Sequence, residues 1–172
     1  MNEQDLQARL AQVRLAVFDV DGVFTDGRFY LSDDGSETKA FHTQDGYGIR
    51  MLLSAGFEVA IISGRKSPAA ERRMTELGVQ HCFFACKDKV ATYETLAQRL
   101  EISRHEALYA GDDVPDAALL KAVGVPVAVA NAVPAVKHLA AFVTSRPGGD
   151  KCRELLYGRH GVRDCDRHAN GL

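Results

Sequence analysis

Two aspartates separated by a single residue follow the first strongly apolar segment of the chain. Asp19 and Asp21 lie in the sequence Asp-Val-Asp-Gly at the end of that segment. Because ligands of open α/β sheets bind outside the carboxyl ends of the strands, both carboxylates can face one crevice. Two carboxylates this close repel each other unless a cation neutralises them or one stays protonated. The pair therefore predicts a magnesium site or a general acid, against the simpler alternative of a capping acid with an acidic neighbour.

A second acidic motif follows another apolar segment. Asp112, Asp113 and Asp116 occur in the sequence Gly-Asp-Asp-x-x-Asp. Three acids in five positions are costly beside a strand end unless a cation is present. Asp112 is the natural additional metal ligand, whereas Asp113 and Asp116 are predicted to lie one shell further out, where they orient water or a lysine. A helix N-cap would explain Asp116, but it would not explain the adjacent pair.

An anion-binding site is one interpretation of the residues that follow another apolar segment, and an ordinary turn is the simpler alternative. Ser63, Gly64 and Arg65 supply a hydroxyl, an open glycine backbone and the start of a helix, and such a combination can bind an anion. The guanidinium of Arg65 suits a phosphate or a carboxylate because its donors form a planar fork. Lys89 begins the next predicted helix. Most lysines are solvated surface residues, but Lys89 lies in the sequence between the strand ends that carry Ser63 and Asp112, and this place distinguishes it.

Apolar and amphipathic segments alternate along the chain, and the alternation predicts how these residues are positioned. The apolar segments lack a polar face, as strands do when helices cover both sides of a parallel sheet; they comprise residues 15–20, 57–63, 81–86, 106–111 and 125–130. Helical spacing is found in residues 45–55, 67–77, 88–100 and 114–123. Ser67, Pro68 and Gly78 supply start and stop signals for the second of these helices. The pattern predicts an α/β fold with a doubly wound, Rossmann-like parallel sheet.

One segment departs from this alternation, at the place where the first helix would be expected. Residues 28–42 predict a β-hairpin, because two extended runs flank an Asp-Gly turn. A two-stranded ribbon is marginally stable in water on its own. Phe29, Leu31 and Phe41 would be exposed unless a partner covered them, so we expect an oligomer.

The composition is that of one globular domain. The chain has 172 residues, of which 46% are hydrophobic, and no linker or repeat divides it, so residues 1–172 are expected to form a single domain. A net charge of −2 and a pI near 6.3 argue against a nucleic-acid partner. No apolar run is long enough to cross a membrane, so no membrane partner is expected. The amino terminus has no signal-peptide pattern and the four cysteines have no metal-binding spacing, so reduced thiols and a cytoplasmic location are expected.

The order of the motifs resembles the haloacid dehalogenase-like phosphatases. The shared motifs are Asp-x-Asp-Gly at 19–22, Ser-Gly-Arg at 63–65, Lys89 and Gly-Asp-Asp-x-x-Asp at 111–116. Longer stretches are similar to the small subgroup that lacks a cap domain, at 19–27, 41–52 and 61–65. The resemblance covers residues from about 13 to 146 and implies a haloacid dehalogenase-like fold, with the hairpin inserted after the first strand and without a cap domain.

The resemblance also implies a role for each motif. Asp19 would be the nucleophile that forms an aspartyl phosphate, and Asp21 would be the general acid and then the base. Asp19, the backbone carbonyl of Asp21 and Asp112 would bind Mg²⁺. Ser63 would hold the phosphoryl oxygens, and Lys89 would offset charge on the phosphoryl group and on Asp19. The implied substrate contacts are Gly46, Gly64 and Arg65.

A substrate class and an assembly follow from the same resemblance. It implies a Mg²⁺-dependent phosphomonoesterase for a small acidic sugar phosphate, with an eight-carbon ulosonate 8-phosphate of lipopolysaccharide sugar synthesis expected. The alternatives are a nine-carbon, sialic-acid-type 9-phosphate and a non-catalytic assembly protein with the same fold, although every acid that the chemistry needs is present. The hairpin would assemble a homotetramer in which a neighbouring subunit helps to close the site. The tail at 147–172 departs from the glycine-rich pattern of the family, because it lacks the third glycine.

Overall fold

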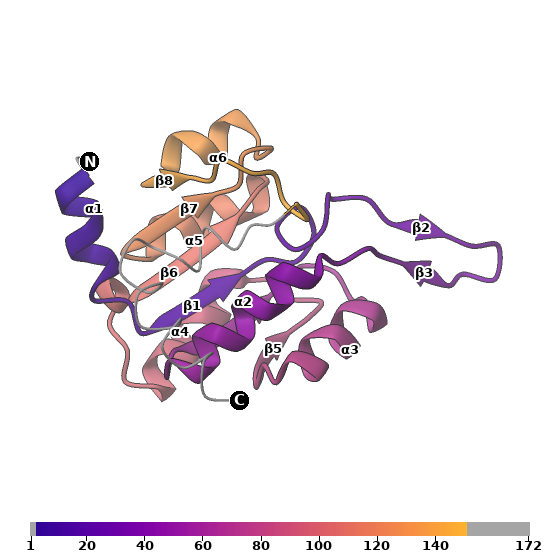
Figure 1. Cartoon of the computed structure of the whole chain (residues 1–172), viewed down its shortest axis with the longest axis horizontal. Helices are drawn as coiled ribbons and strands as arrows, with labels where there is room; N and C mark the ends of the chain where they lie inside the picture. Colours follow the sequence, from indigo (N-terminus) through magenta and orange to yellow (C-terminus); the bar gives the residue numbers. More distant parts are fainter. Residues whose placement is uncertain (1–2, 151–172) are drawn as a thin grey trace.

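Parallel pairing of short strands organises the part of the chain that the computed structural model describes, residues 3–150. The paired strands are β1 (Leu15–Phe18), β4 (Glu58–Ile62), β5 (His81–Phe83), β6 (Ala107–Gly111), β7 (Val125–Ala128) and β8 (Phe142–Val143). Within the described range they form one six-stranded sheet in the order β5-β4-β1-β6-β7-β8, and every pair is parallel (Figure 1). The predicted α/β class and the parallel sheet are confirmed.

Helices cover the sheet in two groups. The α-helices are α1 (Glu3–Leu10), α2 (Thr43–Ser54), α3 (Pro68–Leu77), α4 (Lys89–Arg99), α5 (Ala117–Ala122) and α6 (Pro134–Leu139), and the 3₁₀ turns are η1 (Arg104–Glu106) and η2 (Val114–Asp116). Helix α2 contacts α3, and α4, α5 and α6 contact one another in series. Since parallel crossovers are right-handed, the strand order places the two groups on opposite faces. No helix among residues 3–150 combines the length and the apolar character that crossing a membrane requires.

The ends of α3 illustrate how local sequence sets the elements. The side chain of Ser67 accepts a hydrogen bond from the backbone N–H of Ala70, as an N-cap does. Gly78 adopts a left-handed φ of 88°, which a residue with a side chain seldom takes. Both predicted boundaries of this helix are confirmed.

Several sequence expectations differ from the structure at the margins of the sheet. The segment 81–86 was expected to be a buried strand, but β5 spans three half-buried residues because it is an edge strand with a neighbour on one side only. The segment 114–123 begins with the turn η2 before α5. Three elements, α1, α6 and β8, were not expected from the sequence, because they are too short or too polar to show a clear period.

The hairpin projects from the body of the protein (Figure 1). Its strands, β2 (Tyr30–Leu31) and β3 (Glu37–Thr38), pair antiparallel. Tyr30 and Leu31 are 66% and 69% exposed, and Phe29 is 40% exposed. The expectation that Phe41 is also exposed is wrong: the chain re-enters the body there, and Phe41 packs half-buried against the core. The described residues show no inserted cap domain.

Candidate active site

The register of the sheet brings the chemistry-bearing segments to one edge. Phe18, the last residue of β1, is aligned with Ile61 of β4 and Ala110 of β6. The segments that follow these three strands therefore leave the sheet side by side. Strand β1 also lies where the order of strand addition reverses, which is the position at which α/β sheets bind ligands. The residues gathered at this edge are Asp19, Asp21, Ser63, Gly64, Arg65 and Asp112.

A buried lysine joins two of the predicted acids. Nζ of Lys89, at the start of α4, lies 2.8 Å from Oδ2 of Asp19 and 2.7 Å from Oδ1 of Asp116. The same Asp116 oxygen accepts a hydrogen bond of 2.6 Å from the hydroxyl of Tyr109. Lys89 is 8% exposed, so its charge depends on these carboxylates for compensation. Burial alone would lower the pKa of Lys89, but Asp19 and Asp116 raise it overall, so the ammonium form is favoured.

Asp116 is fully engaged by the protein, whereas Asp113 is peripheral. The second oxygen of Asp116 accepts hydrogen bonds from the backbone N–H groups of Asp112 (2.9 Å) and Asp113 (3.2 Å). Asp116 therefore holds both the lysine and the turn that carries Asp112. Asp113 is exposed, and its side chain accepts a hydrogen bond from the backbone N–H of Val114 at the start of η2.

The two glycines of the acidic motifs make this crowding possible. A Cβ at Gly22 would lie 1.9 Å from Oδ2 of Asp112, and a Cβ at Gly111 would lie 2.5 Å from Oδ2 of Asp116. Gly22 also has a φ of 82°, in the left-handed region. Gly22 thus makes room for a carboxylate of the other motif, and Gly111 makes room for a carboxylate of its own motif.

The acids carry more negative charge than Lys89 balances. Burial raises the pKa of Asp112 to about 7, and the neighbouring Asp116 and Asp19 add to the rise. Burial also raises the pKa of Asp19, although Lys89 opposes the shift. Carboxylate oxygens of Asp19, Asp112 and Asp116 lie within 4.8 Å of one another. A hard divalent cation such as Mg²⁺ fits this donor set, and Asp19 and Asp112 are the better ligands because Asp116 is already occupied.

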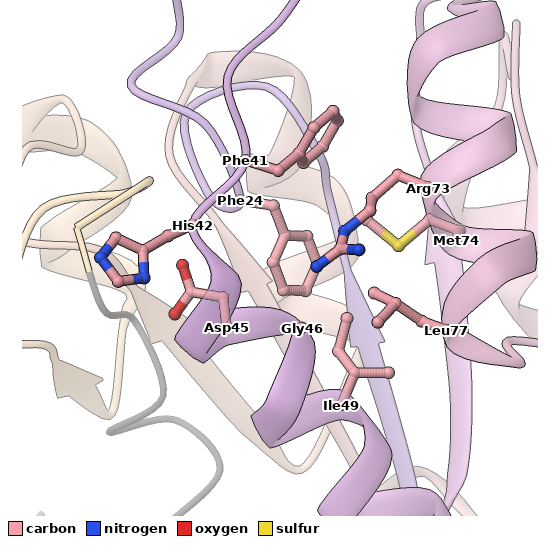
Figure 2. Close-up of a pocket in the computed structure, with 9 residues that line it drawn as sticks. All are labelled: Phe24, Phe41, His42, Asp45, Gly46, Ile49, Arg73, Met74 and Leu77. Carbon is pink, nitrogen blue, oxygen red and sulfur yellow. The ribbon is translucent and has the colours of Figure 1, made fainter.

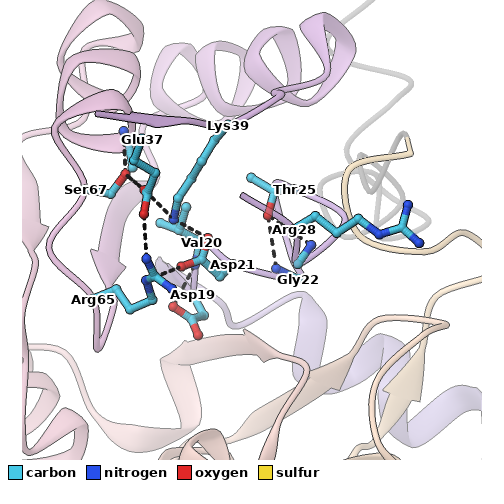
Figure 3. Close-up of polar contacts among 12 residues, drawn as sticks. Asp19, Val20, Asp21, Gly22, Thr25, Arg28, Glu37, Lys39, Arg65 and Ser67 are labelled. Atoms are coloured by element: carbon cyan, nitrogen blue, oxygen red, sulfur yellow. Dashed lines mark hydrogen bonds and ion pairs between the residues drawn. The ribbon is translucent and has the colours of Figure 1, made fainter. Parts of the chain in front are cut away.

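Asp21 belongs to a second charged network, which includes two residues that the sequence analysis did not single out (Figure 3). Nζ of Lys39 contacts Oδ1 of Asp21 and lies 3.5 Å from Oε1 of Glu37. Nη2 of Arg65 lies 2.5 Å from Oε2 of Glu37, and its Nε lies 3.7 Å from Oδ2 of Asp21. Glu37 belongs to β3 and Lys39 follows that strand, so the hairpin supplies half of this network.

The remaining predicted site residues differ in their surroundings. Ser63 is 3% exposed, and its backbone is fixed by hydrogen bonds between its N–H and the carbonyl of Phe83 and between its carbonyl and the N–H of Cys86. Gly64 and Arg65 follow it and are exposed, at the rim of the strand-end edge. The structure therefore places a buried hydroxyl and an exposed guanidinium within three residues.

Gly46 lies in the first turn of α2, where it lines a small cavity (Figure 2). That helix begins at Thr43, two residues before the expected start. A Cβ at Gly46 would lie 2.3 Å from Nη2 of Arg73, so the glycine makes room for this guanidinium. The small cavity there is lined by Phe24, Phe41, His42, Asp45, Gly46, Ile49, Arg73, Met74 and Leu77. It shares no residue with the Asp19–Lys89 cluster.

Two glycines near the end of the described range pack closely against the loop after Asp21. A Cβ at Gly148 would lie 1.6 Å from the carbonyl oxygen of Gly22, and one at Gly149 would lie 2.6 Å from the carbonyl carbon of Thr25. The N–H of Gly148 donates a 2.8 Å hydrogen bond to Oδ1 of Asn131. These glycines therefore support the loop of their own chain. The rest of the tail expectation, residues 151–172, lies outside the described residues.

Comparison with known proteins gives concordant results. The profile of a haloacid dehalogenase-like hydrolase family matches residues 85–148. The 3-deoxy-D-manno-octulosonate 8-phosphate phosphatase of Escherichia coli K12 is 41% identical over 145 residues, which cover 84% of this chain and 77% of that protein. The enzyme of the same name from Yersinia pestis is also 41% identical, over 84% of this chain and 78% of its own length.

Solved structures extend the similarity to nearly the whole chain. A phosphatase of this name from Moraxella catarrhalis, solved with a magnesium ion, a phosphate ion and KDO, matches with a TM-score of 0.93 and 30% identity over 99% of each chain. A probable phosphatase from Pseudomonas syringae matches with a TM-score of 0.92 and 41% identity over 98% of each chain. The cobalt-bound form of the deoxy-D-mannose-octulosonate 8-phosphate phosphatase from Haemophilus influenzae matches with a TM-score of 0.84 and 32% identity over 92% of each chain.

Proposed function

The chain belongs to the haloacid dehalogenase-like hydrolases, in the family of the 3-deoxy-D-manno-octulosonate 8-phosphate phosphatases, and we propose that it hydrolyses this sugar phosphate to the free sugar and phosphate. The observation that carries the proposal is the Asp19–Lys89–Asp116 cluster beside Asp112 at the switch point of the sheet. A phosphomonoesterase of this family needs a nucleophile, a lysine that offsets charge and a cation site, and the cluster can supply all three.

The chain's own residues divide the chemistry between the two networks. Asp19 attacks the phosphorus, and the bond between phosphorus and the sugar oxygen breaks. Asp21 gives a proton to the departing oxygen and then takes one from the water that hydrolyses the aspartyl phosphate. Lys89 stays charged between Asp19 and Asp116 and stabilises negative charge on the phosphoryl group. Ser63 holds the phosphoryl oxygens.

The cofactor is Mg²⁺, held by Asp19, Asp112 and the backbone carbonyl of Asp21. When bound, it neutralises the surplus charge of the acids and of the phosphoryl oxygens. Asp116, with Asp113 outside it, keeps Lys89 and the turn of Asp112 in place. Gly64 and Arg65 at the rim, and Gly46 in α2, are the substrate contacts that we propose.

A panel of phosphate esters tests this assignment. We expect Mg²⁺-dependent phosphate release with kcat/KM highest for 3-deoxy-D-manno-octulosonate 8-phosphate, at least about tenfold above a nine-carbon 9-phosphate, because one misplaced substrate group costs about 1–3 kcal/mol. Phosphate release is measured at equal enzyme concentration with and without a chelator. A preference for the nine-carbon ester would reassign the substrate. No turnover of any ester, 4-nitrophenyl phosphate included, would favour the non-catalytic alternative.

The hairpin supports a further proposal, that four copies assemble into a homotetramer. Tyr30 and Leu31 are two-thirds exposed on a ribbon of two-residue strands, which is marginal alone and can be completed by symmetry-related copies. A neighbouring subunit would then help to close a site that has no cap domain.

Charge placed on the hairpin tests the assembly. Leu31→Glu should convert the tetramer to smaller species in light scattering, because four carboxylates would be buried without partners. It should lower kcat/KM for the sugar phosphate more than for 4-nitrophenyl phosphate, which needs no sugar contacts. Val143→Glu, at a half-exposed apolar residue of β8, is the matched control and should leave the assembly intact. A fully active native monomer would contradict the proposal.

We also propose that residues 1–172 form a single domain and that the protein works in the cytoplasm. Cys82 and Cys86 are free thiols, as a reducing compartment requires. Cys152 and Cys165 lie outside the described residues.

A further inference from the structure

A buried lysine from the hairpin reaches the proposed acid–base residue. The side chain of Lys39 is 0% exposed, and its Nζ lies between Oδ1 of Asp21, which it contacts, and Oε1 of Glu37 at 3.5 Å. A buried ammonium group is costly unless carboxylates compensate it. Lys39 is therefore stable in this place only while it stays paired with both acids.

Lys39 engages one oxygen of Asp21 and leaves the other. Oδ2 of Asp21 is buried and has no hydrogen-bond partner among residues 3–150, and Nε of Arg65 lies 3.7 Å from it. A group that transfers a proton needs one oxygen within hydrogen-bond reach of the reacting oxygen. Anchoring Oδ1 while Oδ2 accepts no hydrogen bond from the described residues meets this requirement.

The hairpin fixes the lysine from the other side (Figure 3). Glu37 accepts hydrogen bonds from the hydroxyl of Ser67 (3.0 Å) and from Nη2 of Arg65 (2.5 Å). The guanidinium of Arg65 also lies 3.8 Å from the centre of the Phe29 ring. The base of the hairpin is thus tied to the start of α3, and these contacts hold Glu37, the second carboxylate partner of Lys39, in place.

We propose that Lys39 is a positioning residue for Asp21. It orients the carboxyl group so that Oδ2 meets the departing sugar oxygen. The inference rests on the proposed function, in which Asp21 gives its proton to that oxygen as the bond to phosphorus breaks. The lysine can remain on Oδ1 whether or not Oδ2 carries the proton. The hairpin then has a role in its own subunit's site in addition to any role in assembly.

Leaving groups of different basicity separate positioning from a merely structural role. A sugar alkoxide needs a proton in order to leave, whereas 4-nitrophenolate does not. Lys39→Met should lower kcat/KM for 3-deoxy-D-manno-octulosonate 8-phosphate about 100-fold and for 4-nitrophenyl phosphate less than about fivefold. Lys121→Met, on the exposed surface of α5, removes a lysine charge elsewhere and should change neither value. If the Met variant does not fold, Lys39→Gln, which keeps a polar group in the buried place, carries the same comparison.

A double-mutant cycle with Asp21→Asn completes the test. If Lys39 acts through Asp21, Lys39→Met should cost less than about twofold in the Asp21→Asn background, because a shared function is lost only once. Equal losses on both esters, or additive losses in the cycle, would overturn the inference. If Asp21→Asn discriminates between the esters and Lys39→Met does not, Lys39 has no positioning role and the proposed function stands. If Asp21→Asn itself does not discriminate, the acid role of Asp21 fails and the inference fails with it.

Discussion

Asp19→Asn should reduce sugar-phosphate turnover at least about a thousand-fold while the protein stays folded, because removal of a nucleophile typically costs several orders of magnitude. The amide has nearly the shape of the carboxyl group but cannot attack phosphorus. Lys89 keeps its 2.7 Å contact with Asp116, so the substitution does not leave a buried charge unpaired. Burial already raises the pKa of Asp19, so a neutral side chain at this position should not lower the melting temperature of the metal-free protein.

Two measurements check this expectation. Steady-state phosphate release gives the loss of activity, and rapid quenching followed by mass spectrometry should detect a phosphorylated protein in the native enzyme and none in the variant. Asp5→Asn, an exposed position in α1, is the matched control and should retain activity. More than a tenth of native activity in Asp19→Asn would show that another group attacks the phosphorus.

The sequence was most informative where physical constraints are local. Strands β1, β4 and β6 are apolar on both faces, and each ends directly before polar residues, so the strand-end cluster followed from pattern and topology. Gly111 accommodates Asp116 of its own motif, whereas Gly22 accommodates Asp112 of the other motif, which is far away in the sequence. The short elements at the margin of the sheet could not be predicted from the sequence, because a two-residue strand such as β8 has no measurable hydrophobic period.

The contacts made by the hairpin could not be read from the sequence. Lys39 is 18 residues from Asp21, and a lysine on a hairpin is normally solvated. Its burial depends on how the hairpin leaves the body, which Phe41 and the Glu37–Arg65 pair determine in three dimensions. Tyr109 was likewise hidden, because within an apolar segment nothing marks the one hydroxyl that donates to Asp116.

The proposed metal site should affect the free energy of unfolding as well as the activity. Burial raises the pKa of Asp112 to about 7, well above the value of about 4 expected in the unfolded chain. Between these values the folded protein binds more protons than the unfolded one. The stabilising contribution of this group is therefore complete below pH 4 and is lost as the pH rises through about 7.

Asp112→Asn should flatten this pH dependence and abolish stabilisation by Mg²⁺. In the metal-free native protein, Asp112 should make unfolding easier at pH 8 than at pH 5.5 by on the order of 1–2 kcal/mol, after solvent screening of a partly exposed group. Saturating Mg²⁺, at about 100 times its Kd, should restore about 2.7 kcal/mol at pH 8. The variant should lack both effects, since an amide neither titrates nor balances a divalent charge, and its turnover should fall to the level of the chelated enzyme.

Thermal unfolding at the two pH values, with Mg²⁺ or with chelator, measures both effects on stability. The control variant Asp33→Asn, on the exposed hairpin turn, should behave like the native protein. A variant that is still stabilised by Mg²⁺ would place the cation away from Asp112.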